Sequence, residues 1–255
     1  MNFKVKMERS SRDRRSRIVL ALDLYSLKSE KLISKSLEIL ECTQKYVCAV
    51  KINRHLILPL GLHDGVRKIL DATEDFGLPS IMDCKINDIG YTNQIIAEEY
   101  FKAGFDAITA NPFIGWDEGL KPVFDKARKL GKGIILLVYM SHKAAVEGYG
   151  QRVIDPFTGE IKPQYIVFAR RALLWGADGA VVGATYPEKI NEVFNVLKNR
   201  VPVYSPGVGT QGGSGEAAIK SGARFLIIGR SIVKAKDPAE AAKSFKDKIA
   251  NLCRQ

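Results

Sequence analysis

The chain has 255 residues, with 39 lysine and arginine side chains against 28 aspartate and glutamate side chains, which gives a formal net charge of +11. Hydrophobic residues make up 46% and charged residues 26%, as in an ordinary globular protein that can bury a substantial core. No apolar run approaches the roughly 18 residues that cross a bilayer, so the sequence excludes a membrane-spanning helix. The basic excess indicates an anionic partner: nucleic acid, an anionic lipid or a phosphorylated metabolite.

The charge is concentrated at the start of the chain. Residues 1–17 carry seven lysines and arginines against Glu8 and Asp13, a local charge of +5 that leaves +6 for the remainder. The segment has neither a long apolar core nor a small-residue cleavage site, so we do not expect a secretory signal, and its acidic residues count against a transit peptide. We expect residues 1–16 to be a solvated, partly disordered basic tail, with nucleic-acid contact as the less favoured alternative.

Eight short apolar runs follow, rich in Val, Ile, Leu and Ala without strict alternation, which is typical of parallel strands covered on both faces. They are residues 17–23, 46–52, 79–85, 106–110, 133–139, 178–183, 201–205 and 224–229. Helical patterns lie between them at residues 31–40, 92–103, 120–130, 163–175, 187–198 and 238–252. Eight strands with helices between them favour an α/β fold, a (β/α)8 TIM barrel in one domain over residues 17–255. A doubly wound open sheet is the competing architecture, although no G-x-G-x-x-G opens the first helix.

Residues 141–162 form the one long irregular stretch that the sequence predicts. Loops of this length in compact domains are usually lids, binding loops or disordered segments. Because the stretch follows the fifth strand, it would open onto the C-terminal face of a barrel, where active sites lie. We therefore expect a functional loop here.

The four cysteines, Cys42, Cys48, Cys84 and Cys253, form no C-x-x-C pair and have no zinc-type spacing with the three histidines. A disulfide framework is not expected in a domain of this size. This cysteine usage indicates a reducing compartment, and we expect the protein to be cytoplasmic.

Charged residues stand at the ends of the first three strands. Asp23 ends the first, Lys51 the second, and Asp83 and Lys85 the third, with Asp88 three residues further on. In a barrel all of these positions meet at one mouth. Asp88 on its own favours an N-cap of the next helix slightly over a catalytic group.

Asp83 and Lys85 are two residues apart on a strand, so both side chains are expected to point into the barrel, while Cys84 points to the helix layer. A structural ion pair is the alternative interpretation. Because burying an ion pair costs desolvation free energy that its attraction only partly returns, a functional site is the better one.

Glycine-rich segments follow the last two strands. Residues 205–215 read SPGVGTQGGSG. Residues 229–231 read GRS, and we expect them to open a short helix. Glycines let backbone N–H groups converge on an anion, a guanidinium fits phosphate oxygens, and barrels often bind phosphate at this place. The segments predict a phosphorylated small-molecule ligand, with a plain flexible turn as the alternative.

Together these motifs resemble one known family. Residues 83–89, DCKINDI, with Thr92, resemble the D-x-K-x-x-D-I signature of orotidine 5′-phosphate decarboxylases. Residues 205–213 resemble the phosphate-gripping loop of that family and residues 229–231 its last phosphate motif. Asp23, Lys51 and Ser141 occur in the expected order, and the resemblance spans residues 17–250.

The resemblance implies a homodimer that converts orotidine 5′-monophosphate to uridine 5′-monophosphate, the last step of UMP biosynthesis, without metal or organic cofactor. Lys85 would protonate C6 of the pyrimidine. Lys51, Asp83, Lys85 and Asp88 would form the catalytic charge network, with Asp88 and Thr92 contributed to the neighbouring subunit's site. The implied substrate-binding residues are Asp23, Lys51, Thr92, Ser141, Pro206, Gly207, Val208, Gly209, Gln211, Gly212, Gly213, Gly229 and Arg230.

Within that set, the resemblance implies that Asp23 and Lys51 meet the ribose hydroxyls, together with the partner's Asp88. Ser141 would read the pyrimidine edge, and Gln211 and Arg230 would hold the phosphate.

Two other functions compete with this one. The nearer is a magnesium-dependent sugar-phosphate lyase that resembles this chain around D-x-K-x-x-D, such as a 3-keto-gulonate-phosphate decarboxylase or a hexulose-phosphate synthase. Those enzymes are expected to place an acidic metal ligand where this sequence has Lys51. The other is a nucleic-acid-binding protein, but no recognised nucleic-acid module supports it. We expect neither nucleic acid nor membrane as a partner.

Overall fold

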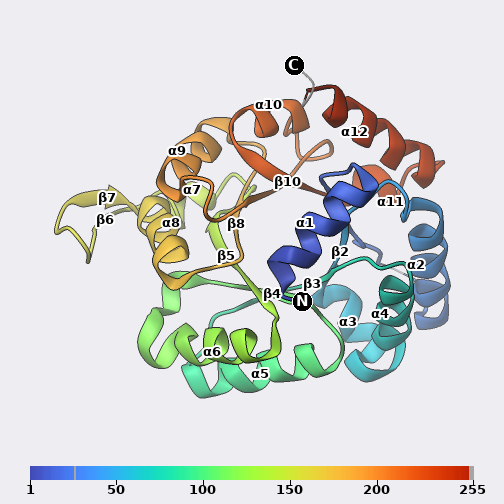
Figure 1. Cartoon of the computed structure of the whole chain (residues 1–255), viewed down its shortest axis with the longest axis horizontal. Helices are drawn as coiled ribbons and strands as arrows, with labels where there is room; N and C mark the ends of the chain where they lie inside the picture. The colour runs from blue at the N-terminus through green and yellow to red at the C-terminus, as the bar shows by residue number, and fades with distance from the viewer. Residues whose placement is uncertain (26, 253–255) are drawn as a thin grey trace.

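The computed structural model describes residues 1–25 and 27–252. Eight parallel strands close into a barrel in the order β1, β2, β3, β4, β5, β8, β9, β10 and back to β1 (Figure 1). They are β1 (Ile18–Ala21), β2 (Ala49–Asn53), β3 (Ser80–Ile86), β4 (Ala107–Ala110), β5 (Gly133–Tyr139), β8 (Gly179–Val182), β9 (Val203–Pro206) and β10 (Ala223–Ile228). Each overlaps one of the eight predicted runs, so the TIM-barrel prediction is confirmed and the open sheet is wrong.

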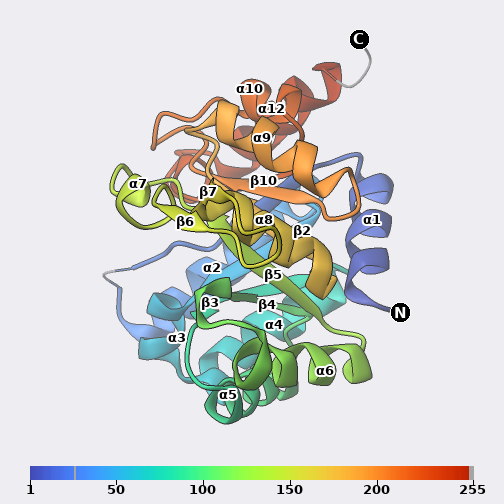
Figure 2. The same cartoon turned by 90° about the vertical axis from the view of Figure 1, so that its left-hand side faces the viewer.

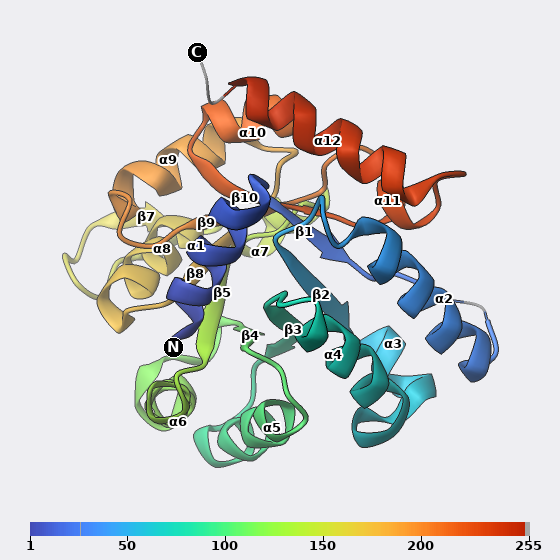
Figure 3. The ribbon, with the colours of Figure 1, turned by 45° about the vertical axis from the view of Figure 1, so that its right-hand side comes forward.

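Helices surround the barrel. Six match the predicted patterns: α2 (Ser29–Thr43), α5 (Gly90–Lys102), α6 (Lys121–Leu130), α8 (Gln164–Trp175), α9 (Pro187–Leu197) and α12 (Pro238–Leu252). The sequence did not predict α3 (Arg54–Leu60), α4 (Val66–Asp75) and α10 (Gly215–Lys220), nor the helical turns Gly61–Gly65, Pro112–Ile114 and Trp116–Leu120. The short helix α11 (Arg230–Val233) begins in the segment GRS, as predicted. Helix α12 packs against α2, so the last helix lies beside the first helix of the barrel ring (Figure 3).

The strands are buried on both faces, which explains why their sequences do not alternate. Side chains such as Val19, Ile81 and Tyr204 pack together inside the barrel, whereas Ile18 and Leu20 belong to the larger core between strands and helices. Burial of these two apolar layers is the main favourable contribution to folding. No helix among residues 1–25 and 27–252 has both the length and the apolar character needed to cross a membrane.

The basic N-terminal segment is folded, so the expectation of a solvated, partly disordered tail over residues 1–16 was wrong. It forms helix α1 (Phe3–Arg14), whose N-terminus is capped by the side chain of Asn2. Its buried residues, Phe3, Met7, Ser10 and Ser11, recur at helical spacing and make one narrow face. Because two of the four are serines, hydrophobicity alone did not reveal this face.

Helix α1 closes the N-terminal end of the barrel, opposite the end where α7 (Ala145–Gly148) lies (Figure 2). The N–H of Phe3 donates to the carbonyl of Gly131 just before β5 (3.1 Å), and the hydroxyl of Ser10 donates to the carbonyl of Cys48 just before β2 (2.7 Å).

The basic side chains of α1 are largely used within the protein. Lys6 pairs with Asp106 at 2.6 Å, and Lys4 donates to the carbonyl of Arg200 at 3.0 Å. Arg14 donates to the carbonyls of Gln44 and Phe76. The local positive charge therefore holds the helix on the barrel.

Residues 141–162 are not irregular throughout. Besides α7 they contain an antiparallel hairpin of β6 (Arg152–Ile154) and β7 (Ile161–Pro163), which projects outward beside α8 (Figure 1). The fully buried carboxylate of Asp155 accepts hydrogen bonds from Arg170 of α8 and from the N–H of Phe157. This ion pair connects the turn end of the hairpin to α8.

Of the four cysteines, Cys253 lies outside the described residues, and the other three are free thiols. Burial raises the pKa of Cys48 and of Cys84 to about 12. Cys84 packs in the core between strands and helices, as predicted from its place between two inward-pointing residues. These thiols are structural rather than reactive.

Candidate active site

One pocket opens at the C-terminal ends of the strands, with about 880 Å³ of empty space including its mouth. The lining residues are Ala21, Asp23, Lys51, Asn53, Asp83, Lys85, Thr109, Leu137, Met140, Ser141, Val181, Pro206, Gly207, Val208, Thr210, Gln211, Ile227, Gly229 and Arg230. The barrel thus gathers residues separated by more than two hundred positions into one site, as the charged strand ends predicted.

Most of the predicted site residues meet here. The pocket contains Asp23, Lys51, Asp83, Lys85, Ser141, Pro206, Gly207, Val208, Gln211, Gly229 and Arg230. Five others do not line it: Asp88, Thr92, Gly209, Gly212 and Gly213. The last three shape the turn of the glycine-rich loop from within, because the N–H of Gly209 donates to the carbonyl of Gly213 (3.0 Å) and that of Gly212 to the carbonyl of Gly209 (2.7 Å).

The sequence missed several lining residues. Asn53 is two positions beyond Lys51 on β2, so strand alternation could have placed it on the same face. Thr109 is a polar residue in an otherwise apolar strand, and Thr210 adjoins the predicted Gln211. Apolar lining residues such as Met140 and Ile227 carried no signal that distinguished them from core.

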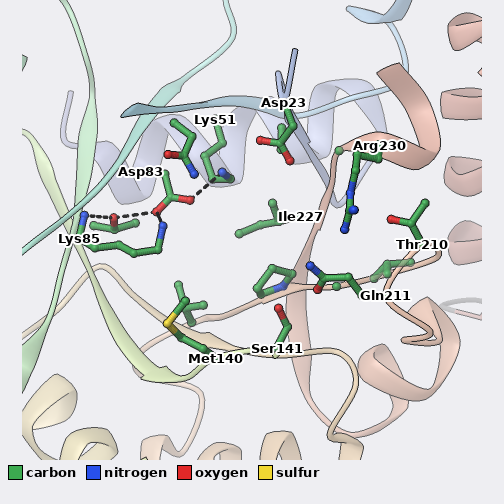
Figure 4. A pocket seen from close by; sticks show the side chains of 18 of the residues that line it. Asp23, Lys51, Asp83, Lys85, Met140, Ser141, Thr210, Gln211, Ile227 and Arg230 are labelled. Carbon is green, nitrogen blue, oxygen red and sulfur yellow. Dashed lines mark hydrogen bonds and ion pairs between the residues drawn. The ribbon is translucent and has the colours of Figure 1, made fainter. Parts of the chain in front are cut away.

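Three charged side chains form a chain across the floor of the pocket (Figure 4). One carboxylate oxygen of Asp83 lies 2.7 Å from the Nζ of Lys51, and the other lies 2.6 Å from the Nζ of Lys85. The Lys51 and Asp83 side chains are only 7% and 12% exposed, whereas that of Lys85 is 26% exposed. Of these three charged side chains, Lys85 is therefore the most accessible to a bound molecule.

Mutual attraction keeps Asp83 and Lys51 ionised despite their burial. Burial alone would raise the pKa of Asp83, but Lys51 and Lys85 outweigh that effect and hold it well below its ordinary value. Burial would likewise lower the pKa of Lys51, yet the carboxylates of Asp83 and Asp23 raise it. The charges of Asp83 and Lys51 therefore do not change with pH near neutrality.

Lys85 has an unusual backbone conformation. Its φ is 51°, in the left-handed region, and the register between β3 and β4 shifts between Met82 and Ile86. A non-glycine residue pays about 1 kcal/mol or more for this conformation. Asp83 and Lys85 both line the pocket as predicted, but they do so through an irregular strand rather than by simple alternation.

The glycine-rich loop and Arg230 lie across the pocket from the charged chain (Figure 4). Gly207 has a φ of 96°, and a Cβ there would come within 2.8 Å of the Oε1 of Gln211 and 3.0 Å of the Cβ of Ser141. The N–H of Thr210 donates to the hydroxyl of Ser231 at 3.2 Å. This contact ties the loop after β9 to the one after β10.

Two further contacts hold the segments that line the pocket in place. A Cβ at Gly229 would lie 2.4 Å from the Oδ2 of Asp23, so only glycine lets the two segments approach this closely. The hydroxyl of Thr185 donates to the carbonyl of Ser141 at 3.0 Å.

Asp88 and Thr92 lie at the start of α5, outside the pocket, and Asp88 is exposed. Asp88 does not cap this helix, which corrects our interpretation of the residue taken alone. Its Oδ1 accepts from the N–H of Ile89, the next residue, whereas an N-cap accepts from a residue two or three positions on. Nothing within this one chain brings either residue to the pocket.

Residues 1–25 and 27–252 contain no group of three or more His, Cys, Asp or Glu side chains arranged to hold a metal ion. At the end of β2, where a metal-dependent relative would need an acidic ligand, the ammonium of Lys51 is in contact with Asp83. The arrangement can bind an anion at one end and place a protonated amine against a reacting atom at the other.

Comparison with known proteins agrees with this geometry. The model of the "Orotidine 5'-phosphate decarboxylase / HUMPS family" matches residues 16–245. The orotidine 5′-phosphate decarboxylase of Pyrococcus abyssi is 38% identical over 232 residues, which cover 91% of this chain and 98% of that protein.

Solved structures give the same result. Orotidine 5′-monophosphate decarboxylase from Methanocaldococcus jannaschii, complexed with the inhibitor BMP, superposes with a TM-score of 0.76 at 29% identity, over 91% of this chain and 97% of that one. The UMP synthase of Leishmania donovani superposes with a TM-score of 0.87 at 27% identity, over 99% of this chain but only 56% of that longer chain. By fold, site and sequence, this chain belongs to the orotidine 5′-phosphate decarboxylase / HUMPS family.

Proposed function

We propose that the chain is a carboxy-lyase that converts orotidine 5′-monophosphate to uridine 5′-monophosphate and carbon dioxide, a step of pyrimidine biosynthesis. The observation that carries this proposal is the row of charged side chains Lys51, Asp83 and Lys85 on the pocket floor. It faces the glycine-rich loop and Arg230, which are suited to bind an anion. The relatives at 31% to 38% identity are named for the same reaction.

The proposed chemistry needs a cation at one carbon. When the C6 carboxylate leaves as carbon dioxide, the electron pair of the broken bond stays on C6, where no conjugated group can take it up. Lys85, whose ammonium is the more open of the two, would stabilise the developing negative charge and then donate a proton to C6. The lysine recovers its proton from solvent, so no other reactant is consumed.

The other side chains of the pocket would bind the rest of the nucleotide. Gln211, Arg230 and the amides of the loop from Pro206 to Gly213 would hold the phosphate, and Ser141 would meet the pyrimidine edge. Asp23 and Lys51 would contact the ribose hydroxyls. Anchoring the phosphate far from C6 supplies binding energy that holds the ring against Lys85.

We also infer that the protein works as a homodimer. Between Asp88 and Thr92 in the sequence lies a short patch of exposed apolar side chains, in which Ile89 is 64% and Tyr91 76% exposed. Apolar groups of this size on a surface mark interaction sites. A second copy on this patch would bury it and bring Asp88 and Thr92 to the neighbouring pocket.

The proposal includes neither metal nor organic cofactor. A divalent cation at the mouth would face the ammonium of Lys51 instead of the acidic ligand that the sugar-phosphate lyases of the superfamily are expected to provide. Residues 17–255 would act as one catalytic domain in the cytoplasm, in keeping with the free thiols of Cys42, Cys48 and Cys84.

The decisive experiment follows the ultraviolet absorbance of orotidine 5′-monophosphate after addition of purified protein in excess EDTA. Turnover supports the proposal, and absence of turnover contradicts it. Turnover only with added Mg²⁺ would contradict a reaction without a metal. Lys85→Ala should abolish turnover, with a loss of at least about 10³-fold in kcat, whereas Lys121→Ala on the exposed face of α6 should not change it.

A further inference from the structure

We propose that Thr109 is a positioning residue, which holds Asp83 and Lys85 in the geometry that catalysis requires. This inference rests on the proposed decarboxylation and assigns a role to a residue that the sequence motifs leave out. Thr109 stands on β4, next to the strand that carries the charged pair, and is only 3% exposed.

The Thr109 hydroxyl uses both of its hydrogen-bonding functions on these two neighbours. It donates to the Oδ1 of Asp83 at 3.1 Å and accepts from the backbone N–H of Lys85 at 2.9 Å. The same Oδ1 receives the Nζ of Lys85 at 2.6 Å. One buried hydroxyl therefore contacts both the carboxylate of Asp83 and the main chain of Lys85, the residue that would donate the proton.

The backbone explains why such a contact is needed. The β3–β4 ladder pairs Met82 with Ile108 and then resumes only at Ile86 with Ala110. Lys85 lies in the skipped part with a φ of 51°, so its N–H is bound by a side chain instead of a backbone carbonyl. A left-handed lysine persists only where its surroundings compensate for the strain. The Thr109 hydroxyl provides that compensation.

The carbonyl of Thr109 adds a second connection, because it accepts from the Sγ of Cys84 at 3.3 Å. Residues 83, 84 and 85 each contact this one residue. Thr109 therefore contacts every residue of the irregular segment from Asp83 to Lys85.

The arrangement predicts which kinetic constant changes. Thr109 contacts Asp83 and Lys85. Gln211 and Arg230 lie across the pocket from these two residues (Figure 4). Replacing the hydroxyl by a methyl group keeps the side-chain volume but leaves the N–H of Lys85 without its acceptor. Displacement of a catalytic group by about 1 Å costs on the order of 100-fold in rate. The loss should therefore appear in kcat, with little change in nucleotide binding.

The test compares wild type, Thr109→Val and Thr109→Ser with orotidine 5′-monophosphate, and measures the affinity of each for uridine 5′-monophosphate by calorimetry. We expect Thr109→Val to lose about 10- to 100-fold in kcat, while KM and the affinity for uridine 5′-monophosphate change less than about threefold. Thr109→Ser, which keeps the hydroxyl, should recover most of kcat.

Thr73→Val is the matched control. Thr73 is 1% exposed, and its hydroxyl donates only to the carbonyl of Ile69 within α4, remote from the pocket. The melting temperature of this variant should fall about as much as that of Thr109→Val, while its kcat should equal that of wild type. A purely structural role for Thr109 would make the two valine variants behave alike, and that result would overturn the proposal.

Two further outcomes separate the possible failures. If wild type does not turn over orotidine 5′-monophosphate, the proposed function is wrong. If wild type is active and Thr109→Val retains kcat within twofold, only the positioning role is wrong. Should Thr109→Val fail to fold, Thr109→Ala against Thr109→Ser replaces it: a slow alanine variant beside a fast serine variant supports the role, and equal rates contradict it.

Discussion

Asp83 and Lys51 face each other from neighbouring strands, with 2.7 Å between the Oδ2 of the carboxylate and the Nζ of the ammonium, and both are buried. Two opposite charges placed this way stabilise each other, and removal of either leaves the other largely buried without its counter-ion. The folded state therefore depends on both being present and ionised.

Asp83→Asn should remove about 3 kcal/mol from the free energy of unfolding at pH 7, because it leaves Lys51 charged and buried without its nearest counter-ion. Urea unfolding followed by circular dichroism measures this difference. Asp125→Asn, which breaks an exposed ion pair with Lys121, is the control and should change stability little. Equal effects of the two substitutions would show that burial of the site pair is unimportant.

The contribution of Asp83 should also depend on pH. Its pKa in the folded state is held below the ordinary value of 3.8, so the stabilisation is fully present above that value and is lost as pH falls through the lower, folded pKa. The stability gap between wild type and Asp83→Asn should therefore be constant from pH 7 to about pH 5 and shrink below about pH 4. A gap that stays constant down to pH 3 would contradict the lowered pKa.

Gly229→Ala should impair substrate binding. The added Cβ would lie 2.4 Å from the Oδ2 of Asp23, so either the carboxylate or the loop that carries Arg230 must move. We expect KM for orotidine 5′-monophosphate to rise about tenfold. Gly148→Ala is the control, since a Cβ there meets no atom within 4 Å. Unchanged KM in Gly229→Ala would remove Asp23 from the binding site.

Phe3→Ala should destabilise the protein without changing catalysis. Phe3 is 1% exposed and packs directly on Gly133 at the end of the barrel opposite the pocket. Loss of this buried ring should cost about 3 kcal/mol, measured by urea unfolding, with kcat unchanged. Val5→Ala on the same helix, where the side chain is 50% exposed, should have little effect. A Phe3→Ala variant as stable as wild type would mean that α1 contributes no packing energy.

Shared sites in a homodimer can be tested by complementation. Asp88→Ala and Lys85→Ala should each be inactive alone, because every site in either dimer lacks one group. In a mixed dimer, one site combines an intact Lys85 with an intact Asp88 from the other chain. Random mixing should restore about a quarter of wild-type activity. Absence of any recovery, with mixed dimers present by native mass spectrometry, would place Asp88 outside the neighbouring site.

The barrel could be predicted because each of its strands is a short apolar run, and the charged mouth because Asp23, Lys51 and Asp83 interrupt that pattern where strands end. What could not be predicted depends on three-dimensional context. The left-handed backbone of Lys85 is stabilised by Thr109, which is 24 residues away in sequence. Helix α1 was missed because its buried face includes Ser10 and Ser11, which hydrogen-bond to backbone carbonyls instead of adding hydrophobicity.

Helix α1 also constrains the order of assembly. It precedes the barrel strands in the chain, yet the surface that buries Phe3 and Met7 exists only after the strands have come together. Its Glu8 pairs with Arg224 at the start of the last strand, 216 residues later. Complete docking of the helix therefore requires that β10 has already joined the barrel. Interactions that form late in folding affect the unfolding rate more than the folding rate. We therefore expect loss of the α1 contacts to speed unfolding more than it slows folding.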